Sequence, residues 1–413
     1  SEPFIVSYAL GDDIVIVGRT DSDDFFISNN AAFPQYSGNT DGFILKLSNS
    51  GCDETAFSYP DFSSIEDLNI IEWAARDNDN IVLTPSSPWK GGAIWHDQKI
   101  PVKNGFTTTF EFRISEGSND YEEEQYPGAD GVVFVIQNHE REAYGAMGGG
   151  LGFDGIPNSL AVEFDTYKNY EMNKIQGATD DPNANHAAVF CNGIYPNSSG
   201  HNIASNLATN DTIMDIVPDG RSYFVKIEYN IEPNIMKIWL DDDDVYESEP
   251  IIVLDDIDIS EMLDLSCGEF AWVGITSATG IAYEKHEILN WEICPEPTSK
   301  RIPNPKITSG KDSVCKNILT EYSCNTEPGL MYNWEAIGGN IEGAEDEPTV
   351  QVNWYQGGKC ELTLIQYYPG NCGDTIRKTI TVMSSPDMSI TGDLNVCRKD
   401  EHIYSIKNQQ GVD

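Results

Sequence analysis

The chain has 413 residues, which is too long for one ordinary domain, so two to four domains are expected. It carries 25 Lys and Arg against 67 Asp and Glu, a formal net charge of -42. Such a field repels nucleic acid and anionic membranes, and no stretch reaches the roughly 20 apolar residues of a membrane helix. The composition therefore argues against nucleic-acid binding and membrane insertion, and it suits carboxylates that bind hard cations.

The nine cysteines predict disulfides rather than a zinc site. None belongs to a CxxC pair, and scattered cysteines in an acidic, β-rich chain are typical of an oxidising compartment. Buried free thiols are the alternative. We expect Cys52 to pair with Cys294 and Cys191 with Cys267. Further pairs are expected among Cys315, Cys324, Cys360 and Cys372, and the partner of Cys397 is expected further along a larger polypeptide.

Residues 1–51 predict a small antiparallel unit. Strand-like runs at residues 13–18 and 41–47 lie on either side of a polar loop. The pattern IVIVGRTDSDDF followed by TDGFILKLSNSG resembles a bacterial β-propeller-type (SBBP-like) repeat. One copy cannot close a propeller, so the resemblance implies the last repeat of a longer array or a lone unit beside its neighbour.

Residues 53–296 form one long block of short strands without an obvious linker. Apolar and polar residues alternate in runs such as residues 106–114 and 223–229, and clusters of Gly, Asn, Asp and Pro separate these runs. Helical periodicity is nearly absent. This texture predicts an all-β chain built from sandwiches or barrels.

A proline-rich linker at residues 297–305 leads into a second β segment at residues 306–385, around Trp334. This segment resembles the PKD and Ig-like sandwiches of bacterial surface proteins, which usually act as spacers. A further module of this kind begins at residues 386–413, because ITSGKDSVCKN and ITGDLNVCRKD align as repeats. We therefore expect a modular chain.

The most specific motif is LAVEFDTYKN at residues 160–169, followed by DPNANH at residues 181–186. Alternation along a strand puts Glu163 and Asp165 on the same face and continues in that register to Asn169. Carboxylates, an amide, a carbonyl and an imidazole converging on one spot suit a pair of divalent cations. Calcium suits the oxygen ligands, and a transition metal suits a set that includes a histidine.

This pattern resembles the metal motif of the legume-type (L-type) lectins, V-E-F-D-T-[FY]-x-N … D-P … H. The resemblance implies one site for Ca2+ and one for Mn2+ or another transition metal. Carried over by position, Glu163 and His186 bind the transition metal, while Asp165 and Asp181 bridge both ions. The resemblance also assigns two calcium ligands, the Tyr167 carbonyl and the Asn169 side chain.

One departure from the family pattern concerns the interval between the two parts of the motif. Residues 170–180 are longer than the usual spacing, so Asp180 competes with Asp181 for the bridging position. We prefer Asp181 because it precedes Pro182, as the family pattern requires. The manganese site depends most on how this loop is built.

Further family motifs follow in the expected order. ADGVVF at residues 129–134 matches the segment whose Asp accepts hydrogen bonds from sugar hydroxyls and whose Ala–Asp peptide is cis. GGGLGF at residues 148–153 matches the loop that donates a backbone N–H to the sugar, and residues 281–283 match the monosaccharide-choosing loop. The resemblance thus implies the sugar-binding residues Asp130, Gly149, Gly150, Asn169, Ile281, Ala282 and Tyr283.

The resemblance covers residues 53–296 and implies a concanavalin-like jelly-roll β-sandwich. With the flanking modules, it implies a calcium-dependent, non-catalytic carbohydrate-binding adhesin that is secreted to a bacterial surface. The mixture of modules resembles the large adhesins of gliding bacteria. A structural stalk or a protein-binding adhesin with a degenerate lectin fold is the alternative.

A glycoside hydrolase is a further alternative, because the same sandwich architecture hosts such enzymes. One retaining family with this architecture carries E-x-D-x-x-E on a strand, but here Lys168 occupies the position of the second Glu and Glu171 comes too late. No G-x-S-x-G, H-E-x-x-H or P-loop pattern is present. We therefore expect no enzyme activity.

Overall fold

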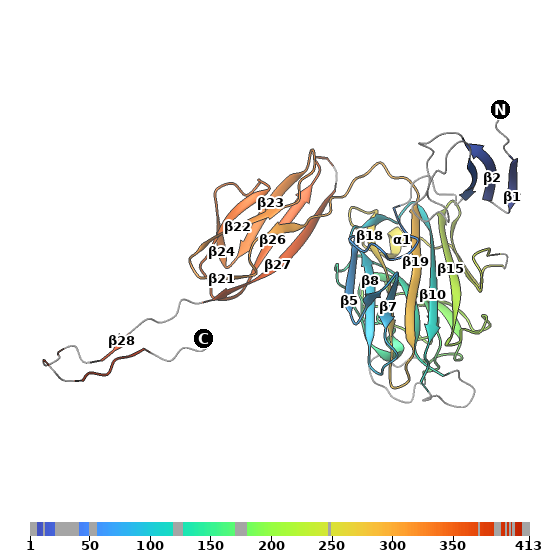
Figure 1. Cartoon of the computed structure of the whole chain (residues 1–413), viewed down its shortest axis with the longest axis horizontal. Coiled ribbons are helices and arrows are strands. Elements are labelled where there is room, and N and C mark those ends of the chain that lie inside the picture. The colour runs from blue at the N-terminus through green and yellow to red at the C-terminus, as the bar shows by residue number, and fades with distance from the viewer. Residues whose placement is uncertain are drawn as a thin grey trace.

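The computed structural model is built almost entirely of β-strands (Figure 1). At the N-terminal end, β1 (Val6–Leu10), β2 (Asp13–Thr20) and β3 (Asp41–Ser48) form an antiparallel sheet, and β2 and β3 contain the two expected strands. In the ranges described, no helix is both long and apolar enough to cross a membrane. The structure describes residues 6–10, 13–20, 41–48, 56–118, 127–169, 180–246, 249–370, 372–383, 390–392, 395, 398 and 401–406.

The largest unit is a sandwich of two antiparallel sheets. In the first, which we call the back sheet, buried and partly exposed residues alternate along the long central strands, because only one face packs on the core. Its strands, in order across the sheet, are β17 (Ile252–Asp255), β16 (Asn234–Asp241), β15 (Asp219–Ile231), β10 (Gly105–Ser115), β19 (Lys285–Pro295), β7 (Asn80–Thr84) and β6 (Ala75–Asp77), with β4 (Phe57–Tyr59) paired to β19.

The second sheet carries the candidate site, and we call it the site sheet. Every residue of its central strands is buried, because one face packs on the back sheet and loops cover the other. Leu151 and Phe153 follow the short helix η1 (Gly148–Gly150) and pack on this covered face. The strands, in order, are β14 (Asn206–Asn210), β13 (His186–Cys191), β12 (Ser159–Asp165), β11 (Gly131–Gln137), β18 (Phe270–Ala278), β8 (Gly91–His96) and β5 (Leu68–Glu72), with β9 (Ile100–Pro101) paired to β18.

Aromatic side chains fill the space between the two sheets. Phe112 of the back sheet lies 6.0 Å from Phe164 of the site sheet, and Phe110 lies 6.4 Å from Phe134, measured between ring centroids. Burying one such side chain stabilises the fold by roughly 2–3 kcal/mol. The one-turn helix α1 (Ile259–Met262) adds Ile259 to the same core. The predicted all-β, concanavalin-like sandwich is confirmed.

His96, at the end of β8, makes the stability of this sandwich dependent on pH. It stacks on Phe57 at 4.2 Å and its Nδ1 lies 3.3 Å from the Tyr59 hydroxyl. Burial lowers its pKa to about 4, although the charges of Asp67 and Asp97 oppose this shift. The unfolded chain therefore binds one more proton than the folded chain between about pH 6.5 and pH 4.

The contribution of His96 to stability is therefore present above pH 6.5 and is lost as the pH falls to 4. The free energy of unfolding should fall between pH 7 and pH 4.5 in both proteins. In His96→Asn we expect this fall to be about 2 kcal/mol smaller than in the wild type. Urea unfolding followed by tryptophan fluorescence measures this difference. The exposed His139→Asn is the control, and equal pH slopes for the two variants would contradict the expectation.

A smaller sandwich follows at residues 307–383. Its core contains Trp334 and Trp354, both fully buried, and the indole N–H of Trp334 donates to the Glu347 carbonyl at 2.9 Å. One sheet contains β20 (Ile307–Ser309), β22 (Leu319–Cys324), β25 (Thr349–Trp354) and β24 (Gly339–Glu342). The other contains β21 (Ser313–Cys315), β27 (Gly373–Met383), β26 (Gly358–Tyr367) and β23 (Met331–Ile337), and β28 (Ile390–Thr391) pairs with β29 (Ser405–Ile406) further on.

The two sandwiches are joined by charged contacts and by a disulfide. Lys99 of the large sandwich lies 2.9 Å from Asp374 of the small one. Asp97 pairs with Lys306 just before β20, and Asn304 in the linker accepts a hydrogen bond from Arg141 at 2.8 Å. The proline-rich linker is therefore anchored on both sides. Finally, Cys267 forms a disulfide with Cys372.

This disulfide corrects two of the sequence-based pairings. Cys191 does not pair with Cys267, because Cys191 is a buried free thiol within the site sheet. The four later cysteines do not pair among themselves, because Cys372 is bound to Cys267 across the joint. Cys294 is disulfide-bonded, while its expected partner Cys52 and also Cys397 lie outside the described residues. The remaining free thiols are Cys315, Cys324 and Cys360.

We expect the Cys267–Cys372 bond to restrain the joint rather than either sandwich. The double variant Cys267→Ser, Cys372→Ser should keep both sandwiches folded but speed proteolysis of the linker at residues 297–305 several-fold, since local opening controls cleavage. Time courses by gel and mass spectrometry measure this. Cys315→Ser, which removes an exposed free thiol, is the control, and unchanged cleavage in the double variant would contradict the role of the bond.

Candidate functional site

The register of the site sheet brings the sequence motifs to one edge. Asp165, the last residue of β12, pairs with Gly131 on β11 and with His186 on β13. Asp130 immediately precedes Gly131, so Asp130, Asp165 and His186 lie at the same end of three neighbouring strands. Glu163 lies two residues before Asp165 and shares its face of the strand. Local strand geometry therefore assembles four of the predicted residues.

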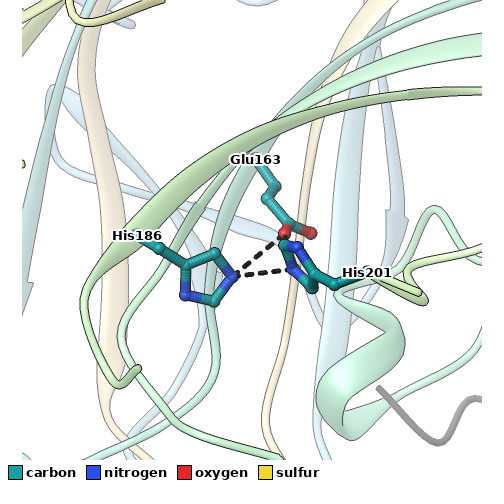
Figure 2. A group of neighbouring side chains, drawn as sticks. All are labelled: Glu163, His186 and His201. Atoms are coloured by element: carbon teal, nitrogen blue, oxygen red, sulfur yellow. Dashed lines mark hydrogen bonds and ion pairs between the residues drawn. The ribbon is translucent and has the colours of Figure 1, made fainter. Parts of the chain in front are cut away.

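Glu163, His186 and a second histidine, His201, meet in one cluster (Figure 2). Oε1 of Glu163 lies 3.3 Å from Nε2 of His186 and 3.1 Å from Nε2 of His201. The two Nε2 atoms are 2.9 Å apart, and His201 Nε2 lies 3.6 Å from Oδ1 of Asp181. All these side chains are nearly inaccessible to solvent.

His201 was missed by the sequence reasoning. It lies in the loop between β13 and β14, outside every motif. The chain has six histidines, and nothing in the sequence around His201 indicates that it approaches Glu163. Tertiary contacts bring it in: its ring meets Phe190 edge-on at 5.2 Å, and the Asn206 side chain donates to its carbonyl at 3.0 Å. Its Nδ1 lies 3.1 Å from the Thr209 hydroxyl.

A second cluster, next to the first, contains Asp165, Asp181 and His186. The Asn169 N–H donates to Oδ2 of Asp181 at 2.6 Å, and the Asp181 N–H donates back to the Asn169 carbonyl at 3.2 Å. Oδ1 of Asp165 accepts the N–H of Tyr167 at 2.7 Å. Asp181 is buried in the cluster and Asp180 is exposed, so the position that the two residues competed for is occupied by Asp181.

Several buried polar atoms in these clusters have no hydrogen-bond partner. A buried polar atom without a partner costs free energy, so a group of them facing one another indicates a missing ligand. Together the two clusters offer carboxylate oxygens and imidazole nitrogens, and this set of donor atoms fits calcium beside a transition metal. The orphaned oxygens are Oδ2 of Asp130, Oε2 of Glu163, Oδ1 of Asn169 and Oδ1 of Asp181.

Electrostatics point the same way. Burial raises the pKa of Asp165 well above its usual range, and the charges of Asp181 and Glu163 raise it further. Burial also raises the pKa of Asp181 to about 6. Burial would raise the pKa of Glu163, but hydrogen bonds from His186 and His201 lower it overall. So many buried carboxyl groups can all be ionised only beside compensating positive charge, which divalent cations supply.

Asp130 lies close to Asn169, at the same edge of the site sheet as Asp165. The Ala129–Asp130 peptide is cis, as the family pattern implied, and the Asp130 carbonyl accepts the N–H of Thr166 at 2.8 Å. The Asn169 side chain is close enough to the Asp130 carboxyl group to lower its pKa, against the larger effect of burial. Burial raises the pKa of Asp130 well above its usual range, as do the charges of Glu284 and Asp181.

Gly149 is the loop glycine that faces this site. A Cβ on Gly149 would lie 2.6 Å from Oδ1 of Asn169, so only glycine permits this approach. Gly150 faces Ala146 instead, and its N–H donates to the Met147 carbonyl at 3.3 Å. Of the two predicted glycines, Gly149 is therefore the better candidate for a ligand contact.

The loop at residues 281–283 directly follows Gly280, which lies close to Asp130. A Cβ on Gly280 would lie 3.5 Å from Oδ2 of Asp130. Ile281 is exposed and Ala282 is buried, with its carbonyl accepting the Gly280 N–H at 3.1 Å. Tyr283 is half-buried, and its backbone N–H and carbonyl both hydrogen-bond to Ser118.

A buried chain of hydrogen bonds connects Thr166, which follows β12, to Thr84 on the back sheet. Oε1 of Glu284 accepts from the Thr166 hydroxyl at 2.5 Å and lies 3.1 Å from Nε2 of His286. Nδ1 of His286 in turn lies 2.5 Å from the Thr84 hydroxyl. His286 therefore links the two sheets and has a structural role.

A protein-family model described as a legume lectin β-barrel domain matches residues 60–291, which is more than half of the chain. The chain belongs to the legume lectin family. This legume lectin domain is 26% identical over 275 residues to Lectin 8 of Medicago truncatula, and the match covers 60% of this chain and 90% of that protein.

The domain also occurs in longer relatives. The L-type lectin-domain containing receptor kinase V.9 of Arabidopsis thaliana is 25% identical over 271 residues, but the match spans only 38% of that protein and 60% of this chain. Among solved structures, the lectin from Bauhinia forficata in complex with GalNAc has a TM-score of 0.45 and 22% identity, covering 58% of this chain and 97% of that chain. The family membership supports a carbohydrate-binding role for the legume lectin domain.

Proposed function

We propose that this protein is a calcium-dependent, non-catalytic carbohydrate-binding adhesin. One observation carries the proposal: Asp130, Asn169, Gly149 and Gly280 converge beside a buried cluster of carboxylates and imidazoles. The first group offers hydrogen-bonding atoms to a sugar, and the second offers ligands to cations that would hold the first group in place. Membership of the legume lectin family supports the same reading.

In the proposed site, calcium would be held by the Tyr167 carbonyl, Asn169, Asp165 and Asp181. Glu163 and His186 would hold a transition metal such as manganese, which Asp165 and Asp181 would share. The bound ions supply positive charge that lets the buried carboxylates stay ionised. Their structural consequence is at Asn169, whose backbone is tied to Asp181 and whose side chain orients Asp130.

The sugar would bind by hydrogen bonds above this layer. The carboxylate of Asp130 and the side chain of Asn169 would accept from hydroxyl groups, and the Gly149 N–H would donate one bond. Residues Ile281, Ala282 and Tyr283 would border the ring and select the monosaccharide. Because ionised acceptors make the stronger hydrogen bonds, Asp130 would contribute most.

Catalysis is not part of the proposal. A retaining glycosidase needs two carboxyl groups about 5–5.5 Å apart on either side of the glycosidic bond. Here Glu163 and Asp165 are buried among metal-ligating groups, and Lys168 stands where a second catalytic Glu would be. The carboxylates therefore serve cation binding.

The adhesin role rests on the surroundings of the lectin domain. A strongly acidic chain, with 67 Asp and Glu residues, suits a solvated extracellular surface, and β-modules on either side suit display. We propose that the protein is secreted to a bacterial cell surface, as in the adhesins of gliding bacteria. Single sugar sites of this kind are weak, so attachment would depend on many copies.

Glycan-array binding by the full chain, with 2 mM calcium and with EDTA, tests the proposal directly. Calcium-dependent binding to one class of glycan, lost in EDTA, is the expected result. Absence of binding from folded, calcium-loaded protein would overturn it in favour of a structural stalk or a protein-binding module. The glycans that bind are then incubated with the protein and analysed by mass spectrometry. They should remain uncleaved, as expected of a non-catalytic protein.

A further inference from the structure

His201 has no counterpart in the set of ligands that the family resemblance implies. Its Nε2 nevertheless lies closer to Oε1 of Glu163, at 3.1 Å, than does Nε2 of His186, at 3.3 Å. Figure 2 shows the two rings approaching the carboxylate from different sides. Two imidazoles therefore face a site for which the family pattern provides one.

Both rings are oriented by contacts to their other nitrogen. Nδ1 of His186 lies 3.1 Å from the Asn183 carbonyl, which only accepts, so Nδ1 carries the proton and Nε2 presents a lone pair. Nδ1 of His201 lies 3.1 Å from the Thr209 hydroxyl, and its Nε2 points back to Glu163 and His186. This is the arrangement of metal-ligating histidines, whose second nitrogen is held by a neighbouring group.

We propose that His201 is a direct ligand of the second cation, so that this site prefers Zn2+ to Mn2+. Two ligand atoms bound about 2.0–2.2 Å from one ion lie about 3.0–3.5 Å apart. The Nε2 atoms of His186 and His201 are 2.9 Å apart and lie 3.3 and 3.1 Å from Oε1 of Glu163, and Nε2 of His201 lies 3.6 Å from Oδ1 of Asp181. A second imidazole in the ligand set favours zinc over manganese, which prefers carboxylate and water.

The proposal rests on the cation-binding part of the proposed function, but not on sugar binding. The test uses the full chain, stripped with EDTA and reloaded with calcium plus one equivalent of zinc. X-ray absorption at the zinc edge counts imidazole ligands, and two are expected. One imidazole per zinc would overturn the role of His201 without any substitution, and absence of bound zinc would overturn it together with the cation part of the proposed function.

Competition between zinc and manganese measures the preference. Wild-type protein should bind zinc at least about 100-fold more tightly than manganese, and His201→Ala should weaken zinc binding about 10- to 100-fold. His139→Ala removes an exposed histidine elsewhere and is the matched control. Unchanged zinc affinity in folded His201→Ala would overturn the proposal. If zinc has two imidazole ligands but the glycan array shows no binding, only the sugar-binding part of the proposed function is overturned.

A second inference comes from Trp89, which borders the sugar-binding residues. Its side chain is 57% exposed and its backbone has a φ of 55°, which is unfavourable for a bulky residue. A Cβ on Gly148 would lie 3.9 Å from the Trp89 ring and 3.7 Å from Gly280. An exposed indole on a backbone of this conformation, next to Gly148 and Gly280, indicates a function in binding.

Thr279 fixes the loop that carries Trp89. Its hydroxyl donates to the Ser87 carbonyl at 2.8 Å and accepts the Lys90 N–H at 2.9 Å. The Trp89 N–H donates to the Gly280 carbonyl at 2.9 Å, and the Thr279 N–H donates to the Lys90 carbonyl at 2.7 Å. The backbone at Trp89 is therefore fixed against Gly280, the residue that precedes residues 281–283, which lowers the entropy cost of presenting the indole for stacking.

We infer that Trp89 stacks on a second sugar ring, next to the one held by Asp130, so that the site prefers oligosaccharides. This deepens the proposed function and depends on it. Two series of probes are used, each with a monosaccharide and an oligosaccharide. The first is mannose and mannotriose, and the second is galactose and a galactose-terminated tetrasaccharide. For the series that binds, Trp89→Ala should weaken oligosaccharide binding at least about tenfold and monosaccharide binding less than about threefold.

Trp89→Phe should restore part of the oligosaccharide affinity, and oligosaccharide binding should change the tryptophan fluorescence of the wild type but not of this variant. Tyr355→Ala, which removes an exposed aromatic in the small sandwich, is the control. Equal losses for monosaccharide and oligosaccharide, or no loss, would overturn the inference. Absence of any glycan-array binding by the folded, calcium-loaded wild type would overturn it together with the proposed function.

Discussion

Replacing Asp130 by Asn is expected to abolish measurable glycan binding without unfolding the protein. The substitution keeps the shape of the side chain but removes the negative charge and one of its acceptor oxygens. Two hydrogen bonds from sugar hydroxyls to a carboxylate contribute about 3 kcal/mol or more, so affinity should fall more than about 100-fold. Titration calorimetry with a glycan identified on the array measures the loss.

Thermal unfolding distinguishes this effect from loss of structure. Because burial and the charges of Glu284 and Asp181 raise the pKa of Asp130, neutral Asn should leave the cation-free protein as stable as the wild type or more so. The exposed Asp219→Asn is the matched control for both measurements. Retained glycan affinity in Asp130→Asn would show that the sugar is held elsewhere.

Removal of divalent cations is expected to destabilise the large sandwich strongly. Cations that bind the folded chain and not the unfolded one would add about 4 kcal/mol of stability at 1 mM calcium, for a dissociation constant of about 1 µM. For a domain of this size, that corresponds to a fall in the midpoint of thermal unfolding of about 10 °C in EDTA. Calorimetry of the full chain measures it, and the small sandwich is the internal control.

The size of this EDTA effect should depend on pH. Without cations, the folded-state pKa of Asp181 is about 6 and that of Asp165 is raised further, above their values in the unfolded chain. Their contribution to the stability of the cation-free fold is therefore present at low pH and lost as the pH rises through 6. Protons also compete with cations for these ligands. The difference between the calcium and EDTA midpoints should thus shrink between pH 7.5 and pH 5, and a constant difference would contradict the assignment of these carboxylates.

Much of the site follows from local strand geometry and was predictable. Glu163 and Asp165 are two residues apart on a strand, so they share a face in any sheet that the strand joins. The family pattern then placed Asp130, Asn169, Asp181 and His186 around them, and the sandwich around the whole. Asp130 and His186 lie at strand ends, where alternation determines direction, whereas Asn169 and Asp181 lie in loops and were placed by the family pattern alone.

The remainder depends on which loops and thiols meet in space. His201 is 15 residues beyond His186 in sequence, in a loop that strand alternation does not constrain, and its contact with Glu163 exists only because that loop folds over the covered face of the site sheet. Cys267 pairs with Cys372, 105 residues away, because the joint brings them together. Spacing alone could not select that pair over Cys191.

The sequence by itself determined the fold class, the family and the strand-borne carboxylates, because a period of two and a set of ordered motifs are local properties. The tertiary structure decided that Gly149 rather than Gly150 faces Asn169, that the Trp89 ring lies next to Gly148, and that a second imidazole meets Glu163. Each of these depends on distances between loops, which packing determines and sequence separation does not.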